Sequence, residues 1–123
     1  MRPMTLADIL DRYTITELKV YRISEEIYVR EYNLLYEELY MYWSLLKPYI
    51  KALRKVNARI WDLEHAIRNA QEADLGLEEV GRRALRIRDA NAIRIRIKNA
   101  ITRKFGGLSI EGKSQYTKTK KEI

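Results

Sequence analysis

The chain lacks the residues on which several common kinds of site depend. Its 123 residues include no cysteine and one histidine, His65. Disulfides and thiolate metal sites are therefore excluded, and so are the usual zinc sites, which need several Cys or His ligands. No apolar run reaches the roughly 18 residues of a membrane-spanning helix, and the first ten residues have no signal-peptide core. We expect a cytoplasmic protein with no metal, no cofactor and no membrane partner.

Proline and glycine are also scarce, with two and five residues, while 46% of the residues are hydrophobic and 33% are charged. This composition is typical of a helical protein of one domain. Apolar residues recur at alternating steps of three and four, as in long helices that pack at shallow angles. We therefore predict an all-α fold, an antiparallel bundle of three long helices. With a gap at Glu25, the pattern runs through Leu18, Tyr21, Tyr28, Tyr32, Leu35, Leu39, Tyr42, Leu46, Tyr49, Leu53, Val56, Ile60, Leu63 and Ile67.

Proline and glycine place the predicted boundaries of these helices. The first helix is expected over 5–46, about 60 Å at 1.5 Å per residue, with a further break near 13–15, where Thr14 and Glu17 are spaced as in a capping box. Pro48 predicts a break or kink near residue 47, and the second helix is expected over 48–70. Gly76 supplies the next turn, and the third helix is expected over 77–104, before the glycine pair 106–107. We thus predict a bundle domain over 1–107 and an irregular basic tail over 108–123, partly ordered over a polar site.

Tyrosine is concentrated in one stretch, because seven of the nine tyrosines lie between Tyr21 and Tyr49, beside Trp43. Tyrosines near cations can stack on nucleic-acid bases, but at heptad positions they pack helix interfaces with the hydroxyl at the rim. We favour the second interpretation. Since Tyr36, Tyr40 and Trp43 lie off the seam, the stretch is apolar on more than one face, and we expect a homo-oligomer.

The positive charge of the chain, +7 overall, is concentrated in the stretch 82–104, which holds nine Lys or Arg and one Asp. In this predicted helix the three-four pattern passes through Asn91, Arg94 and Lys98, at positions expected to face the interior. Buried charges must be paired. A slightly shifted stripe is apolar and would place Arg94 and Lys98 at its edge; it consists of Ala90, Ile93, Ile97 and Ala100.

The charges of Arg94 and Lys98 can be compensated in two ways. An antiparallel pairing of the second and third helices sets Glu64 against Arg94 or Lys98. In one interpretation the result is a satisfied polar layer that fixes the register of the helices. In the other it is a basic pocket whose carboxylates orient the cations and leave donors for a phosphate group. The face of the second helix that would take part consists of Asn57, Trp61, Glu64 and Arg68.

Four strings of the chain resemble motifs of a family of small all-helical bacterial and phage proteins of uncharacterised function: ILDRYTITELKVYRI, IWDLEHAIR, NAIRIRIKNAI and GGLSIEGKS. The corresponding family strings are L-I-D-K-L-T-I-L-E-I-K, W-E-I-E-D-D-I-R, N-D-R-R-x-x-x-K-x-x-I-N and G-S-x-L-I-E-E-K-S. The resemblance covers both ends and the middle of the chain, and residues 24–49 have no such motif. Two polar positions of the family pattern are occupied here by Ala92 and Ile93.

Residue by residue, the resemblance implies a polar cluster assembled from both chain ends, and it implies no known reaction. The positions that it marks are Asp11, Arg12, Thr14, Glu17 and Lys19 near the start, Asn57, Trp61, Glu64 and Arg68 in the middle, and Asn91, Arg94, Lys98, Glu111, Lys113 and Ser114 late in the chain.

Three functions fit these observations, and we expect the first. It is a non-enzymatic, oligomeric binding protein for an anionic, nucleotide-like small molecule, for example a phage protein that sequesters a host immune signal in the host cytoplasm. Its predicted ligand-binding residues, with no catalytic residue among them, are Arg12, Lys19, Asn57, Trp61, Glu64, Asn91, Arg94, Lys98, Lys113 and Ser114.

Two alternatives remain open at this point. The basic stretch and the pI of about 9.7 suggest a helical protein that binds nucleic acid, although no helix-turn-helix, RNP or zinc-finger motif supports it. An enzyme acting on a phosphorylated substrate could use Asp11, Glu17 and Glu64. It lacks a phosphate-binding glycine loop and an activated nucleophile.

Overall fold

The computed structural model describes residues 4–68 and 72–106. Within these ranges the chain forms only helices, so the predicted all-α class is confirmed. The predicted tail over 108–123 lies outside them. The elements are α1 (Leu6–Arg22), α2 (Glu26–Leu39), the short 3-10 helix η1 (Tyr40–Tyr42), α3 (Trp43–Ala66) and α4 (Glu72–Phe105).

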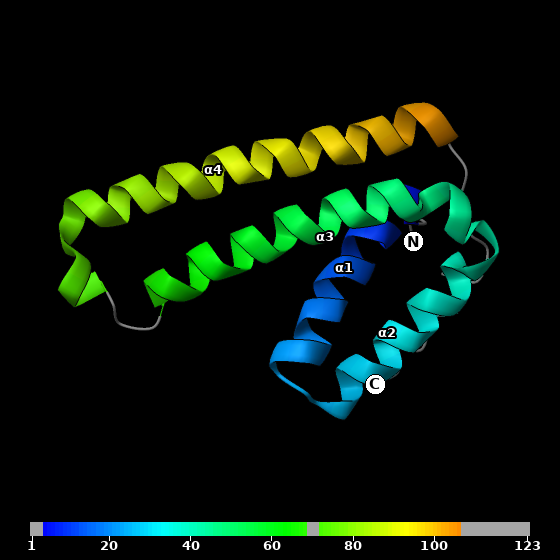
Figure 1. Ribbon diagram of the computed structural model, residues 1–123, viewed down its shortest axis with the longest axis horizontal. Coiled ribbons are helices and arrows are strands. Elements are labelled where there is room, and N and C mark those ends of the chain that lie inside the picture. Colours follow the sequence, from blue (N-terminus) through cyan, green and yellow to red (C-terminus); the bar gives the residue numbers. More distant parts are fainter. Residues whose placement is uncertain (1–3, 69–71, 107–123) are drawn as a thin grey trace.

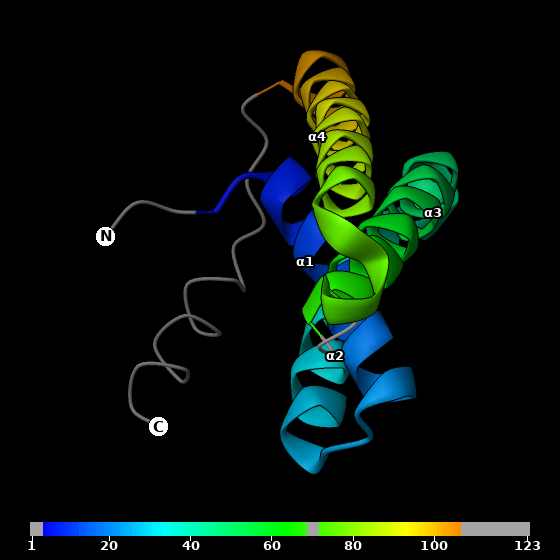
Figure 2. The same ribbon diagram turned by 90° about the vertical axis from the view of Figure 1, so that its left-hand side faces the viewer.

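α1 is the central element of the fold. α3 and α4 lie side by side and run in opposite directions along the molecule, while α1 and α2 form a hairpin set at an angle to them (Figure 1). α1 contacts all three other α-helices, and Figure 2 shows it beside α3 and α4. Nine of its 17 residues are buried, including the polar residues Asp11, Thr14 and Glu17. These polar side chains must therefore find partners inside the bundle.

The predicted continuous first helix over 5–46 is wrong, because the chain reverses direction after Arg22. Ser24 has a left-handed backbone, with φ 62°, and its N–H shares the carbonyl of Lys19 with the N–H of Ile23. The gap in the apolar pattern at Glu25 coincides with this turn. If residues 5–46 formed one helix, Tyr13 and Tyr32 would lie about 28 Å apart along its axis. In the hairpin their rings stack, with their centres 4.9 Å apart.

Two further predicted boundaries are displaced. Thr14 and Glu17 form no capping box, since the Thr14 hydroxyl donates to the carbonyl of Asp11 (2.8 Å) in the middle of α1. The break assigned to Pro48 lies before it, at η1, and Pro48 itself is inside α3. The predicted end of this helix at residue 70 lies outside the described residues.

α4 agrees with the predicted third helix. Gly76, with φ 75°, interrupts its first turn, and the regular helix from Leu77 runs to Phe105, followed by Gly106 with φ 60°. Glycine adopts this left-handed backbone without steric cost, which explains both boundaries. The Phe105 ring meets Tyr49 of α3 edge-on at 5.9 Å.

The tyrosine-rich stretch is divided between core and surface. Tyr13 stacks on Tyr32 and meets Trp43 edge-on at 5.6 Å, so these rings pack α1 against α2 and α3. The helix-interface interpretation holds for this part of the stretch. Tyr40 and Met41, in contrast, are 64% and 82% exposed.

A buried polar layer and a candidate ligand pocket

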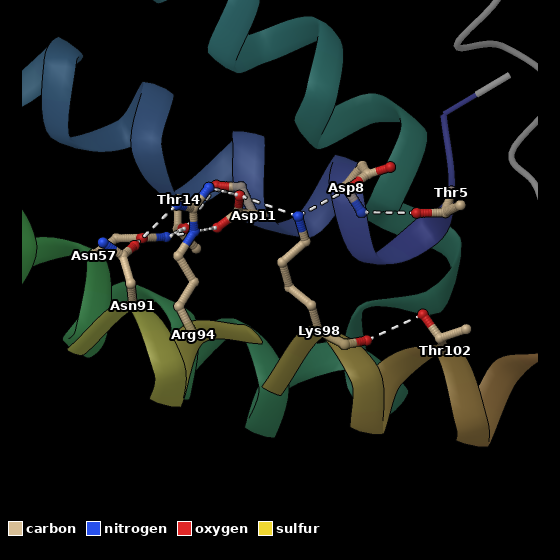
Figure 3. A network of polar contacts seen from close by, with 9 residues as sticks. All are labelled: Thr5, Asp8, Asp11, Thr14, Asn57, Asn91, Arg94, Lys98 and Thr102. Atoms are coloured by element: carbon tan, nitrogen blue, oxygen red, sulfur yellow. Dashed lines mark hydrogen bonds and ion pairs between the residues drawn. The ribbon is translucent and has the colours of Figure 1, made fainter. Parts of the chain in front are cut away.

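A polar layer joins α1, α3 and α4, and Asp11 of α1 is its centre. The Asp11 side chain accepts hydrogen bonds from Nδ2 of Asn57 (3.0 Å) and from Nε (2.9 Å) and one Nη of Arg94. Lys98 Nζ lies 3.0 Å from Asp8 and 3.8 Å from Asp11. As defined here, the polar layer consists of Asp8, Asp11, Thr14, Asn57, Asn91, Arg94 and Lys98 (Figure 3).

The neutral members of the polar layer link its charges. Nδ2 of Asn57 also donates to the Thr14 hydroxyl (2.8 Å), and Oδ1 of Asn91 accepts from Arg94 (3.4 Å). Asp11, Thr14 and Asn57 are 5%, 0% and 4% exposed. The buried groups of the layer are thus hydrogen-bonded to one another, as a low-polarity interior requires.

The ion pairs shift the pKa values of two residues in the polar layer, Arg94 and Asp8. The hydrogen bonds to Asp11 raise the pKa of Arg94 above its usual value. Burial raises the pKa of Asp8, but the interactions with Lys98 and Thr5 outweigh burial, so the net pKa lies below 3.8. Two carboxylates therefore face two cations, and the polar layer is balanced in charge.

The predicted pairing of Glu64 with Arg94 or Lys98 is wrong. α1 packs on both α3 and α4, so the two cations reach carboxylates of α1, and Glu64 pairs with Arg68 one turn further on. Sequence reasoning missed Asp8. Its spacing of three residues from Asp11, which places both carboxylates on one face of α1, is the signal that could have found it.

A second buried cluster joins α1, α2 and α3 around Glu17. This carboxylate accepts two hydrogen bonds from Arg54 (2.6 and 3.1 Å) and one from the Tyr32 hydroxyl (2.9 Å), to which the Tyr13 hydroxyl donates (3.0 Å). The hydrogen bonds to Glu17 raise the pKa of Arg54, and burial raises the pKa of both tyrosines. The three carboxylates that an enzyme acting on a phosphorylated substrate could use each form an ion pair with an arginine. Asp11 pairs with Arg94, Glu17 with Arg54 and Glu64 with Arg68.

A half-open pocket of about 450 Å³ adjoins the polar layer. Its wall brings together five of the predicted ligand-binding residues, from α1, α3 and α4, and adds two polar residues, His65 and Arg68. Its apolar lining includes Ile15, Leu18 and Ile60. Pockets of this size hold small molecules. The five predicted residues are Lys19, Asn57, Trp61, Glu64 and Arg94.

The other predicted ligand-binding residues lie elsewhere. Arg12 contacts Glu31 (2.7 Å) and lines a second pocket of about 410 Å³, which Lys19 also lines. Asn91 and Lys98 belong to the polar layer. Lys113 and Ser114, together with Glu111 of the tail motif, lie outside the described residues.

The fold and the site define the chain as an all-α bundle with a buried polar layer and a pocket of mixed apolar and cationic character. No protein-family model, curated protein or solved structure matches it. Over residues 4–68 and 72–106, no helix is long and apolar enough to cross a membrane. The same ranges contain no group of three or more His, Asp or Glu side chains suited to a metal ion.

Proposed function

We propose that this protein binds an anionic, nucleotide-like small molecule, without chemical turnover, in the 450 Å³ pocket. One observation carries the proposal: the wall of the pocket holds Trp61 together with the cations Lys19, Arg68 and Arg94. An indole ring can stack on a base, and Lys or Arg binds phosphate. The pocket therefore offers a contact for each half of a nucleotide.

Lys19 is the cation best placed to bind the anionic group. Its ammonium lies 5.2 Å from the centre of the Tyr28 ring, and it has no ion pair within the described part of the chain. Arg94 and Arg68 are hydrogen-bonded to Asp11 and Glu64, so a phosphate would compete with carboxylates for them. No such competition opposes binding at Lys19.

The pairing of the carboxylates supports binding rather than catalysis. A general base needs a carboxylate oxygen that can accept a proton from the substrate. The oxygens of Asp11 already accept hydrogen bonds from Asn57 and Arg94, and those of Glu17 from Arg54 and Tyr32. Retention of an unchanged ligand would suit a sequestering protein, such as a phage protein that removes a host immune signal.

We also propose that the protein is a homo-oligomer. The apolar corner, where α2 meets α3, leaves large side chains in water that a second copy would cover. Its residues are Leu34, Tyr36, Tyr40, Met41 and Leu45, which are 41%, 40%, 64%, 82% and 60% exposed.

Calorimetric titration with ADP, adenosine and inorganic pyrophosphate tests the proposed pocket. ADP should bind more tightly than either fragment, because it alone uses both Trp61 and Lys19. Lys19→Met should weaken ADP binding by about 1.5–3 kcal/mol, the usual contribution of a charged hydrogen bond. Chromatography after incubation should return ADP unchanged.

Lys47→Met is the matched control, since it removes an exposed lysine of α3 that does not line the pocket. It should leave ADP affinity unaltered. Equal losses in the two variants would mean that net charge alone attracts the anion. Mass spectrometry of small molecules released when the purified protein is denatured would identify the natural ligand, and a hydrolysed product in either experiment would favour the enzyme alternative.

A further inference from the structure

Unpaired positive charge lies along the exposed sides of α3 and α4, away from the pocket wall. These cations form no ion pair or side-chain hydrogen bond with any other described residue. α3 and α4 lie side by side (Figure 1), so these exposed cations occur on two neighbouring helices. We define this basic surface as Lys51, Lys55 and Arg59 of α3 with Arg86, Arg96, Arg103 and Lys104 of α4.

Acidic residues of the same two helices do not neutralise the basic surface. Each acidic side chain that the structure describes on α3 and α4 forms an ion pair with an arginine outside the basic surface. Exposed acidic residues that form no ion pair with a described residue occur on the α2 side of the hairpin, at Glu25 and Glu37. Charge is thus separated across the molecule, which would orient it toward a polyanion. The pairs on α3 and α4 are Asp62 with Arg22, Glu64 with Arg68, Glu78 and Glu79 with Arg82, and Asp89 with Arg88.

We propose that the basic surface binds the phosphate backbone of double-helical nucleic acid, without selecting a base sequence. Each phosphate that an unpaired cation contacts releases condensed counterions, which favours binding to a duplex. Arg86 and Lys104 are separated by about 27 Å along α4 at 1.5 Å per residue. The surface is therefore long enough to contact several successive phosphates.

The double helix is the favoured form because the basic surface offers no ring for base stacking. Surfaces that bind single strands place aromatic side chains among their cations. Of the aromatic residues of α3 and α4 within the described ranges, Trp43, Tyr49 and Phe105 pack against the core, and Trp61 lines the pocket, outside the basic surface. Reading a base sequence requires side chains that enter a groove and contact base edges, whereas contacts to phosphates carry no sequence information. The cations of the basic surface need to contact only phosphates.

Fluorescence anisotropy with labelled duplexes of about 20 base pairs tests this proposal. Separate DNA and RNA duplexes of the same sequence show which backbone is preferred, and binding of either one supports the proposal. Between about 50 and 200 mM salt, affinity should fall with a log–log slope near −0.9 per phosphate contact, so four contacts give about −3.6. A duplex of scrambled sequence should bind equally well.

Two arginines allow a matched comparison. Arg96→Gln, on the basic surface, should weaken binding and make the salt slope shallower by about 0.9. Arg30→Gln removes an exposed arginine of α2 that pairs with Glu26, and it removes the same net charge, so it should leave the slope unchanged. Circular dichroism should show full helicity in both variants. The proposal is overturned by equal effects of the two substitutions, by tighter binding of a single strand, or by no binding at about 50 mM salt.

Discussion

At the scale of single residues, the Asp11–Arg94 pair decides between the two interpretations of the polar positions on α4. A phosphate pocket would gather cations with too few carboxylates, whereas the structure sets Asp8 and Asp11 against Arg94 and Lys98. Asp11 is the most buried of the four charged groups, with a side chain 7% exposed. Arg94 is therefore first of all the partner of a buried charge, although it also reaches the wall of the pocket.

Arg94→Met should lower the free energy of unfolding by about 3 kcal/mol, because Asp11 stays buried and Lys98, at 3.8 Å, replaces only part of the lost interaction. Adding Asp11→Leu should recover most of that loss, since a buried ion pair can be exchanged for apolar residues at little net cost. Urea unfolding of the two single variants and the double variant measures the coupling. A raised melting temperature for Arg94→Met, with weaker ADP binding, would instead favour the strained phosphate pocket.

The buried tyrosines predict a loss of stability at high pH. The pKa of Tyr13 and that of Tyr32 are raised from 10.0 in the folded protein by burial, so above pH 10 the unfolded chain binds fewer protons than the folded one. Their stabilising contribution is complete below pH 10 and is lost as the pH rises above it. Denaturant unfolding between pH 8 and about 11.5 should show this decline.

Tyr32→Phe removes one of these titrating groups and should flatten the alkaline decline, after an initial loss of about 1 kcal/mol for the hydrogen bond to Glu17. Tyr40→Phe is the control, because Tyr40 is 64% exposed. Identical pH profiles for the two variants would show that the buried hydroxyls do not account for the effect.

At the scale of the helices, the turn at residues 23–25 is the most consequential local feature. It divides the predicted first helix into α1 and α2, and their hairpin brings the Glu17 carboxylate within reach of Tyr32. A non-glycine residue at φ 62° adopts a backbone that costs free energy. The tertiary contacts of the hairpin compensate for that cost.

Ser24→Gly should therefore stabilise the protein, by about 0.5–1 kcal/mol, since glycine takes up the left-handed backbone without strain. Ala92→Gly, at an exposed position inside α4, should destabilise it by about 1 kcal/mol. Thermal unfolding followed by circular dichroism compares the two. If residues 5–46 formed one continuous helix, both substitutions would destabilise the protein.

At the scale of the whole molecule, the apolar corner gathers several of the large apolar side chains that a single chain leaves exposed. Leu39 is fully buried in the core of its own chain, whereas Met41 is 82% exposed. A charge at Leu39 would accordingly unfold the protein, and the exposed positions are the ones that test association.

Light scattering at micromolar concentration should give a mass that is a multiple of the 14.7 kDa chain. Met41→Glu combined with Leu45→Glu should reduce the mass to that of the monomer and preserve helicity, because neither side chain packs in the core. Ile95→Glu, at a 57% exposed position of α4, should leave the mass unchanged. A monomer of the unaltered chain would rule out self-association under these conditions.

Periodicity and glycine placement were sufficient to predict α4 and the helical class. Spacing of three and four residues is a local property, and glycine can take a positive φ without strain, so it readily ends a helix. Gly76 and Gly106 accordingly stand where the third helix was expected to begin and end. Pro48 was less informative, because one missing N–H donor near the start of α3 does not force a break.

Helical spacing also singled out Asn57, Trp61, Glu64 and Arg94, and the resemblance added Lys19, without showing how these residues meet. The chain reversal at Ser24 and the partner of Arg94 depended on tertiary structure, for the same physical reason. A heptad pattern gives the face of a helix that is buried, but it is equally satisfied by a neighbour from any part of the chain. Packing of α1 between α2 and the two long helices decided that Asp11, 83 residues away in sequence, pairs with Arg94 in place of Glu64.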